Sequence, residues 1–278
     1  MMNGPVRVAV LDMYNGEPNE GMRSIKAILD RFKRFVDYTV FDVRLENNVP
    51  GLDFDIYISS GGPGNPLPAG ETWETPFFQL WDGIINNNKQ AGAKKKYAFL
   101  ICHSFQMTAH HYGLGKVNER HSPSFGIFPM HKTLEGNLDP LVKRLPDPFY
   151  AVDSREWQVV EPDMAKVESM GAKILCLEKA RPHVPYERAL MAIRFSKEII
   201  GVQFHPEADA EGMYRYFERP DKKDKIITQY GREKYDQMID YLSDPNKIEL
   251  THHAIIPSFL SDAIEYLLPQ LAKEWSTR

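Results

Sequence analysis

The chain has 278 residues, of which 42% are hydrophobic and 26% are charged, so it is long enough to bury a sizeable core and has the composition of a globular protein. Its formal net charge of -4 excludes the strongly basic surface that marks a nucleic-acid-binding protein. Because no run approaches the ~20 apolar residues that span a bilayer and the N-terminus does not resemble a secretory signal, we expect a cytoplasmic protein with no nucleic-acid or membrane partner.

The first part of the chain alternates strand-like and helix-like segments. Short segments rich in β-branched and aromatic residues predict strands, and apolar residues spaced three or four apart, such as Met22, Ile25 and Leu29, predict helices. We expect strands at residues 6–13, 38–43, 54–60 and 96–102, and helices at residues 20–35, 76–90 and 104–113. This order predicts a flavodoxin-like α/β fold, a doubly wound and mostly parallel sheet with helices on both faces.

Residues 119–155 are rich in proline, glycine and aromatic residues, and there we expect loops and short antiparallel pieces. Strand character returns at residues 172–179, 190–196 and 199–207. In doubly wound sheets ligands bind outside the carboxyl ends of the strands, so residues just past a strand end are favoured site positions. The turn "GGPG" at 61–64, the cysteine Cys102 and the "HPE" at 205–207 all lie there.

About seventy residues follow Glu207. We expect residues 1–212 to form the α/β domain and residues 213–278 to form a helical C-terminal extension packed on it. In residues 257–275 a wide apolar stripe recurs every four residues, which favours packing on the chain's own core over a partner-binding helix, and Pro269 is expected to kink that helix. The stripe consists of Phe259, Ala263, Leu267, Leu271 and Trp275, beside Leu260, Ile264, Leu268 and Ala272.

The two cysteines, Cys102 and Cys176, are far apart and in no metal-ligand spacing, which argues against a disulfide framework or a zinc site. Cys176 lies in an apolar stretch and is interpreted as a buried strand residue. The adjacent histidine pairs at 110–111 and 252–253 point to different sides in regular structure. We therefore expect no metal site and no cofactor.

Each of the three strand-end segments has two interpretations. Cys102 is either a nucleophile on a strand-to-helix turn or a small core residue, since free cysteine is among the most buried residue types. The glycines at 61, 62 and 64 leave backbone N–H groups open to an oxyanion, or they make a plain tight turn. His205 and Glu207, two apart in extended backbone, are either an oriented imidazole or a surface pair.

Taken together and in order, these segments resemble the class I glutamine amidotransferase family, whose glutaminase domains use a Cys-His-Glu triad. The ending "GVQFHPE" is the most specific signal, and the opening "VAVLDMYN" is similar to the family's first strand. The segment "GLGKVNERHSPSFGI" looks like the segment that follows the nucleophile helix in the glutaminase domain of GMP synthetases. The resemblance covers about the first three quarters of the chain. It implies that L-glutamine is the substrate and that a synthetase or other acceptor subunit is a possible partner.

The resemblance also assigns roles to individual residues. It implies that Cys102 attacks the glutamine carboxamide, that His205 is the acid and base, and that Glu207 holds its ring. The backbone N–H groups of Gly62 and His103 would form the oxyanion hole, with the His103 side chain a packing or solvent residue. Gly64 and Gln106 would help to seat the glutamine.

The chain departs from the family pattern Gly-x-Cys-x-Gly-x-Gln, because Leu100 and Ser104 replace the two glycines. Larger residues there imply a rearranged turn at the nucleophile. Two alternatives to a glutamine amidotransferase therefore stay open. One is a γ-glutamyl hydrolase or peptidase that passes the same thioester to water, and the other is a non-catalytic regulatory relative.

Overall fold

A nine-stranded sheet organises the computed structural model, which describes residues 4–183 and 187–269. Five neighbouring strands are parallel, in the order β2 (Val36–Asp42), β1 (Val6–Asp12), β3 (Ile56–Ser59), β4 (Tyr97–Ile101) and β9 (Ile199–Val202). The sheet continues through antiparallel pairs with β8 (Leu190–Arg194), β7 (Lys173–Glu178), β5 (Lys116–Lys132) and β6 (Phe149–Val160).

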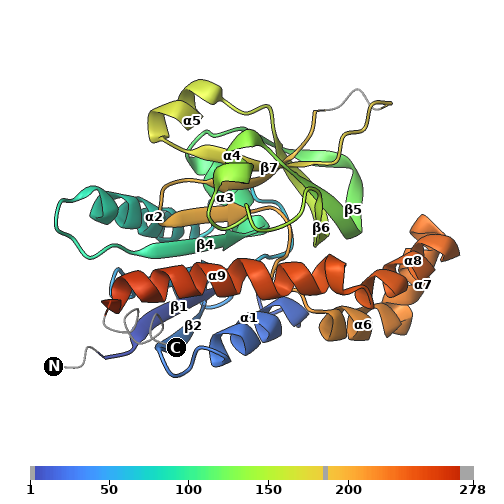
Figure 1. The fold of residues 1–278 in the computed structure, drawn as a ribbon, viewed down its shortest axis with the longest axis horizontal. Helices are drawn as coiled ribbons and strands as arrows, with labels where there is room; N and C mark the ends of the chain where they lie inside the picture. The colour runs from blue at the N-terminus through green and yellow to red at the C-terminus, as the bar shows by residue number, and fades with distance from the viewer. Residues whose placement is uncertain (1–3, 184–186, 270–278) are drawn as a thin grey trace.

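Helices cover both faces of this sheet, so the expected doubly wound α/β fold is confirmed. Along β1 the side chains of Val8 and Val10 enter one core, and those of Ala9 and Leu11 enter the other, as the period of two in a strand requires. The first core is closed by α1 (Glu20–Asp30) and α9 (Leu250–Leu267), which lie side by side in Figure 1 and are joined by a contact between Arg31 and His253. The second core is closed by α2 (Glu74–Lys89), α3 (His103–His111) and α5 (Met164–Met170).

Residues 119–155 correct the sequence prediction, because they form most of two long paired strands rather than loops and short pieces. Strands β5 and β6 pair from Lys116 and Val160 to Met130 and Phe149, with a register shift between Glu119 and Ser124, and the short helix α4 (Leu134–Leu138) follows β5. Proline and glycine residues occur within these strands without ending them, because another part of the chain buries one face of the β5–β6 pair.

That other part is residues 210–249, which are mostly helical. Helices α6 (Ala210–Glu218), α7 (Pro220–Tyr230) and α8 (Arg232–Leu242), with the kinked turn η1 (Pro245–Glu249), pack on β5 and β6 at one end of the molecule (Figure 1). A third apolar cluster lies between them and includes Ile127, Val152, Phe217 and Met238.

Helix α9 begins before the predicted apolar stripe and passes through Pro257. Rather than kinking at Pro269, the helix ends at Leu267, and Leu268 is no longer helical, as expected for a residue that precedes proline. The described part of the stripe, Phe259, Leu260, Ala263, Ile264, Leu267 and Leu268, is buried in the first core. The stripe residues Leu271, Ala272 and Trp275 lie outside the described residues.

No helix in the part of the chain that the structure describes has both the length and the apolar character needed to cross a membrane.

Candidate functional site

Cys102 lies at the turn between β4 and α3 in a conformation that is uncommon for residues other than glycine. Its φ is 46° and its ψ is -99°. Its N–H donates to the Val202 carbonyl at 2.7 Å, which extends the pairing of β4 with β9, and its carbonyl accepts from the Gln106 N–H at 2.9 Å, which starts the helix. Because both backbone groups are bonded, the strand and the helix hold this sharp turn from either side.

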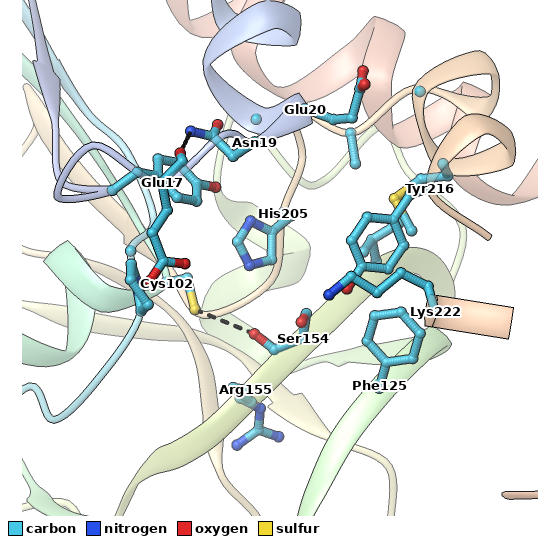
Figure 2. Close-up of a pocket in the computed structure, with 18 of the residues that line it drawn as sticks. Glu17, Asn19, Glu20, Cys102, Phe125, Ser154, Arg155, His205, Tyr216 and Lys222 are labelled. Carbon is cyan, nitrogen blue, oxygen red and sulfur yellow. Dashed lines mark hydrogen bonds between the residues drawn. The ribbon is translucent and has the colours of Figure 1, made fainter. Parts of the chain in front are cut away.

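The Cys102 thiol is nearly buried and has polar neighbours. Its Sγ lies 3.8 Å from the Ser154 carbonyl on β6, a contact drawn in Figure 2, and it accepts from Gln203 Nε2 at 3.6 Å. The residue is 5% exposed, yet it lines a large cavity. A small substrate in the cavity can therefore reach the thiol. The N-terminus of α3 lies directly behind Cys102 and favours a negative charge on its sulfur, as a nucleophilic cysteine requires.

Leu100 and Ser104, which replace the family's glycines, are accommodated by other residues. Beside Leu100, a Cβ at Gly201 would lie 2.7 Å from the Phe105 ring and 2.9 Å from the Phe195 ring, and 3.4 Å from the Leu100 Cβ, so the glycine at 201 makes room for the two rings that pack there. The Ser104 hydroxyl is buried, lies 2.7 Å from the Ser59 hydroxyl and donates to the Ser60 carbonyl at 2.7 Å. The start of α3 is therefore hydrogen-bonded to the residues that precede the 61–64 turn.

His205 follows β9 and is held against Glu207. The His205 Nδ1–H donates to Glu207 Oε1 at 2.8 Å, and the His205 backbone N–H donates to Val152 on β6 at 2.8 Å. Burial alone would lower the pKa of His205, but the negative charges of Glu207 and of the Cys102 thiolate raise this pKa well above its ordinary value. The imidazole therefore keeps a proton that it can give to a leaving group.

Helix α9 supports this pair from behind, because His252 Nδ1 donates to the Glu207 carbonyl at 3.0 Å. The Glu207 side chain is 1% exposed, and its second oxygen, Oε2, has no hydrogen-bond partner among the described residues. Tyr14 lies in the same cluster. Burial, together with the charges of Glu207 and Cys102, raises the pKa of Tyr14 well above its ordinary value, so its phenol stays protonated.

The 61–64 turn lies against the side chains of Cys102 and His205. A Cβ on Gly61 would come within 2.8 Å of His205 Cε1 and 3.5 Å of the Cys102 Cβ, and a Cβ on Gly62 would come within 2.3 Å of the Met13 carbonyl oxygen. These two positions need glycine because neighbouring atoms approach so closely, whereas Gly64 has a φ of +92°.

Arg44 holds this turn in place. Its Nη1 donates to the Met13 carbonyl at 3.1 Å and to the Pro63 carbonyl at 2.7 Å. Two of the segments that meet at the site, the end of β1 and the 61–64 turn, are therefore joined by one guanidinium.

His103 and Gln106, the other two candidates on α3, are both buried. Burial and the charge of Arg44 lower the pKa of His103 to about 3, so its imidazole is neutral and acts as packing. Gln106 Nε2 donates to the Trp157 carbonyl at 3.0 Å and to Gln203 Oε1 at 3.2 Å. Its side chain therefore joins α3 to β6 at the edge of the cavity.

The structure brings the candidates other than His103 together around one cavity of about 1160 Å³. Cys102, His205 and Glu207 line it, as do Gly62, Gly64 and Gln106. In Figure 2, Cys102 and Glu17 lie on one side and His205 in the middle, with Phe125, Tyr216 and Lys222 opposite them.

Sequence reasoning missed several residues of this site. Gly61 belongs to the same glycine run as Gly62, and Gln203 lies within the "GVQFHPE" motif, so both could have been found from the sequence, but Arg44 and the Ser154 carbonyl carry no local signal. The wall formed by α6 and α7 was missed as well. Among the described residues no group of three or more His, Cys, Asp or Glu side chains could hold a metal ion.

Comparison with known families and structures gives a consistent result. A family model described as glutamine amidotransferase class-I matches residues 21–218. Comparison with curated protein sequences gives no significant match.

Three solved structures share the fold at low sequence identity. A glutamine amidotransferase from Thermotoga maritima is 16% identical, with a TM-score of 0.68, and the match covers 95% of this chain and 100% of that one. A protein from Thermoplasma acidophilum described as a GMP synthase subunit is 17% identical (TM-score 0.51, 87% and 96% covered). The glutaminase domain of CTPS from Trypanosoma brucei, with bound acivicin, is 14% identical (TM-score 0.53, 73% and 86% covered).

Proposed function

The chain belongs to the class-I glutamine amidotransferase family, and we propose that it hydrolyses the side-chain amide of L-glutamine through a thioester on Cys102. The observation that carries this proposal is the meeting of three groups in one cavity. A cysteine in a strained turn at a helix N-terminus faces a histidine that a buried carboxylate holds at 2.8 Å.

In the proposed reaction the Cys102 thiolate attacks the carboxamide carbon, and a carbon–sulfur bond forms as the carbonyl oxygen becomes an oxyanion. The backbone N–H groups of Gly62 and His103 stabilise that oxyanion. His205 gives its proton to the departing nitrogen, the carbon–nitrogen bond breaks and ammonia leaves. His205 then takes a proton from water, which attacks the thioester and releases glutamate and the thiolate.

The experiment that tests this proposal is covalent labelling with a diazoketone analogue of glutamine, followed by intact mass and peptide mapping. We expect one adduct on Cys102 and none on Cys176, which is fully buried. Cys102→Ala should lose both the adduct and ammonia release, whereas the control Cys176→Ala should keep both. An adduct that persists in Cys102→Ala would remove Cys102 from the mechanism and favour a non-catalytic relative.

We further propose that the ammonia serves a separate acceptor or synthetase subunit. Glutaminases of this kind gain by staying slow until they are docked, because ammonia released into water is lost to the acceptor. We expect slow hydrolysis by the purified chain and an increase of about ten- to a hundredfold with the partner. The measurement is steady-state ammonia release with and without a co-purifying fraction. Fast turnover that no fraction changes would contradict this proposal.

The size of the cavity favours a second candidate, a γ-glutamyl hydrolase. A volume of about 1160 Å³ exceeds the roughly 300–1,000 Å³ of ordinary small-molecule pockets, and glutamine is a small ligand. The aromatic and basic wall of Phe125, Tyr216 and Lys222 faces the thiol across this space, where the leaving amine of a γ-glutamyl peptide would extend.

The two candidates are separated by comparing kcat/KM for glutamine with kcat/KM for a γ-glutamyl peptide such as γ-glutamyl-phenylalanine. A hydrolase should prefer the peptide, and Tyr216→Ala should reduce turnover of the peptide and leave that of glutamine unchanged. If both the unaltered protein and Tyr216→Ala had the higher kcat/KM for glutamine, the γ-glutamyl hydrolase would be rejected.

A further inference from the structure

A second cavity of about 400 Å³ lies beside the catalytic one. The two share a wall formed by Pro123, Ser124, Phe125 and Tyr230, and the Tyr230 hydroxyl lies 3.5 Å from the Pro123 carbonyl. Strand β6 runs between them. The Ser154 carbonyl is on the thiol side, and the Asp153 side chain lines the second cavity.

The side chains around this second cavity carry an excess of positive charge. Four basic side chains line it, Arg120, Lys179, Arg181 and Lys234, against two carboxylates, Asp153 and Glu178. Arg120 lies 3.2 Å from Glu178 Oε1, and Arg181 lies 3.1 Å from Glu178 Oε2. One carboxylate therefore serves two of the arginines of the wall.

A third arginine adds to this imbalance from behind the wall. Arg155 is 1% exposed, and its guanidinium points away from Cys102 and Ser154 (Figure 2). Its Nε donates to Asp153 at 2.8 Å. Its Nη2 lies 3.3 Å from Glu178 without forming a hydrogen bond, and its Nη1 has no hydrogen-bond partner among the described residues. The Arg155 charge is paired with Asp153 and Glu178, but buried N–H donors left without acceptors are costly, so the cluster lacks acceptors.

The pKa values of two of these side chains are lowered by burial and by neighbouring cations. Burial and the neighbouring charge of Arg155 lower the pKa of Arg120, and burial and the charge of Lys179 lower the pKa of Lys234. Both lysines lie over the ring of Phe128, at 5.4 Å and 4.9 Å from its centre. They extend the basic cluster over an apolar surface.

We propose that this second cavity is a binding site for a small oxyanion ligand, a phosphate or polycarboxylate group attached to an apolar or planar body. The oxygens would pair with Arg181 and Lys234, because a planar guanidinium binds such groups in bidentate fashion and an ammonium adds a point charge. Arg120, whose nitrogens already donate to Ser122, Gln158 and Glu178, would add its charge beside them. The body would lie against Phe125, Phe128 and Met130, which line the same cavity. The site goes beyond the proposed hydrolysis and does not depend on it.

Titration calorimetry at low salt tests this proposal without any turnover, with inorganic pyrophosphate and citrate as separate probes. We expect one of the two anions to bind once per chain, and the one that binds identifies the ligand class. Arg181→Gln and Lys234→Met, both partly exposed at the wall, should each weaken this binding about tenfold or more.

Two controls remove one positive charge elsewhere. The first control is Arg232→Gln, because Arg232 lies on the same helix as Lys234 but pairs with Asp236 outside the cavity. The second is Lys222→Met, because Lys222 lines the catalytic cavity. Both controls should bind the anion within twofold of the unaltered protein. Absence of binding by both anions, equal weakening in all four variants, or a loss confined to Lys222→Met would each overturn the proposal.

Discussion

Removing the Ser104 hydroxyl tests whether the strained turn at Cys102 depends on its hydrogen bond to the segment before the 61–64 turn. In Ser104→Ala the Ser60 carbonyl loses its donor, and the Ser59 hydroxyl loses a neighbour at 2.7 Å. Both groups are fully buried, so water cannot replace the lost bonds. A buried polar group left unsatisfied costs about 1–3 kcal/mol, and we expect the free energy of unfolding to fall by that amount.

The same change should reduce activity. Ser60 directly precedes Gly61 and Gly62, so loss of the hydrogen bond to Ser60 should displace the Gly62 N–H, the proposed oxyanion donor. Complete loss of one such donor costs about a hundred- to a thousandfold in kcat. For a displaced donor we expect a fall in kcat of about tenfold. The assay is steady-state ammonia release, with Tm measured by calorimetry on the same samples. A Tm loss of about 2–4 °C per kcal/mol is expected in a chain of this size.

Thr108 on the same helix offers a matched control. Its hydroxyl is also buried, but it has no hydrogen-bond partner among the described residues. Thr108→Val should therefore leave both Tm and kcat unchanged or slightly raised. If Ser104→Ala behaved like Thr108→Val in both measurements, the link between α3 and the 61–64 turn would have no energetic role, and the reasoning would be refuted.

Three further predictions follow from the site. Cys102 should react with iodoacetamide in the folded protein while Cys176 does not, because burial raises the pKa of the Cys176 thiol. Peptide mapping measures the modification of each cysteine, and equal modification of the two would contradict the prediction. Glu207→Gln removes the charge that raises the pKa of His205, so the alkaline limb of the kcat/KM profile should move to lower pH; an unmoved limb would exclude His205 as the acid. Gly61→Ala places a Cβ 2.8 Å from His205 Cε1. We expect kcat to fall about a hundredfold with little change in Tm, since small displacements of reacting groups have effects of that order. Full activity would show that the His205 ring can move away without loss of function.

Much of the fold could be predicted from the sequence, because its signals are local. Strands β1, β3 and β4 are buried on both faces and appear as short apolar runs, and the amphipathic spacing in α1 predicts a helix. The strand-to-helix position of Cys102 follows from the same local patterns.

Strands β5 and β6 could not be predicted in the same way. Pro123, Gly126 and Pro129 are residues that usually end strands, and they signal loops when the sequence is considered locally. The two strands persist because β7 pairs with β5 and helices α6 to α8 bury one face, and both contacts come from residues far along the chain. Tertiary packing overrides local propensity here.

By itself the sequence determined which chemical groups the site contains and at which strand ends they lie, because Cys102, the 61–64 turn and His205 with Glu207 are marked by neighbours in the chain. Only the tertiary structure decided their mutual geometry and the shape of the space around them. Ser104 joins α3 to the segment before the 61–64 turn, and α6 and α7 form the cavity wall opposite the Cys102 thiol. Such contacts join residues tens to hundreds of positions apart, and they form only when the sheet and its helices have packed, so no local pattern encodes them.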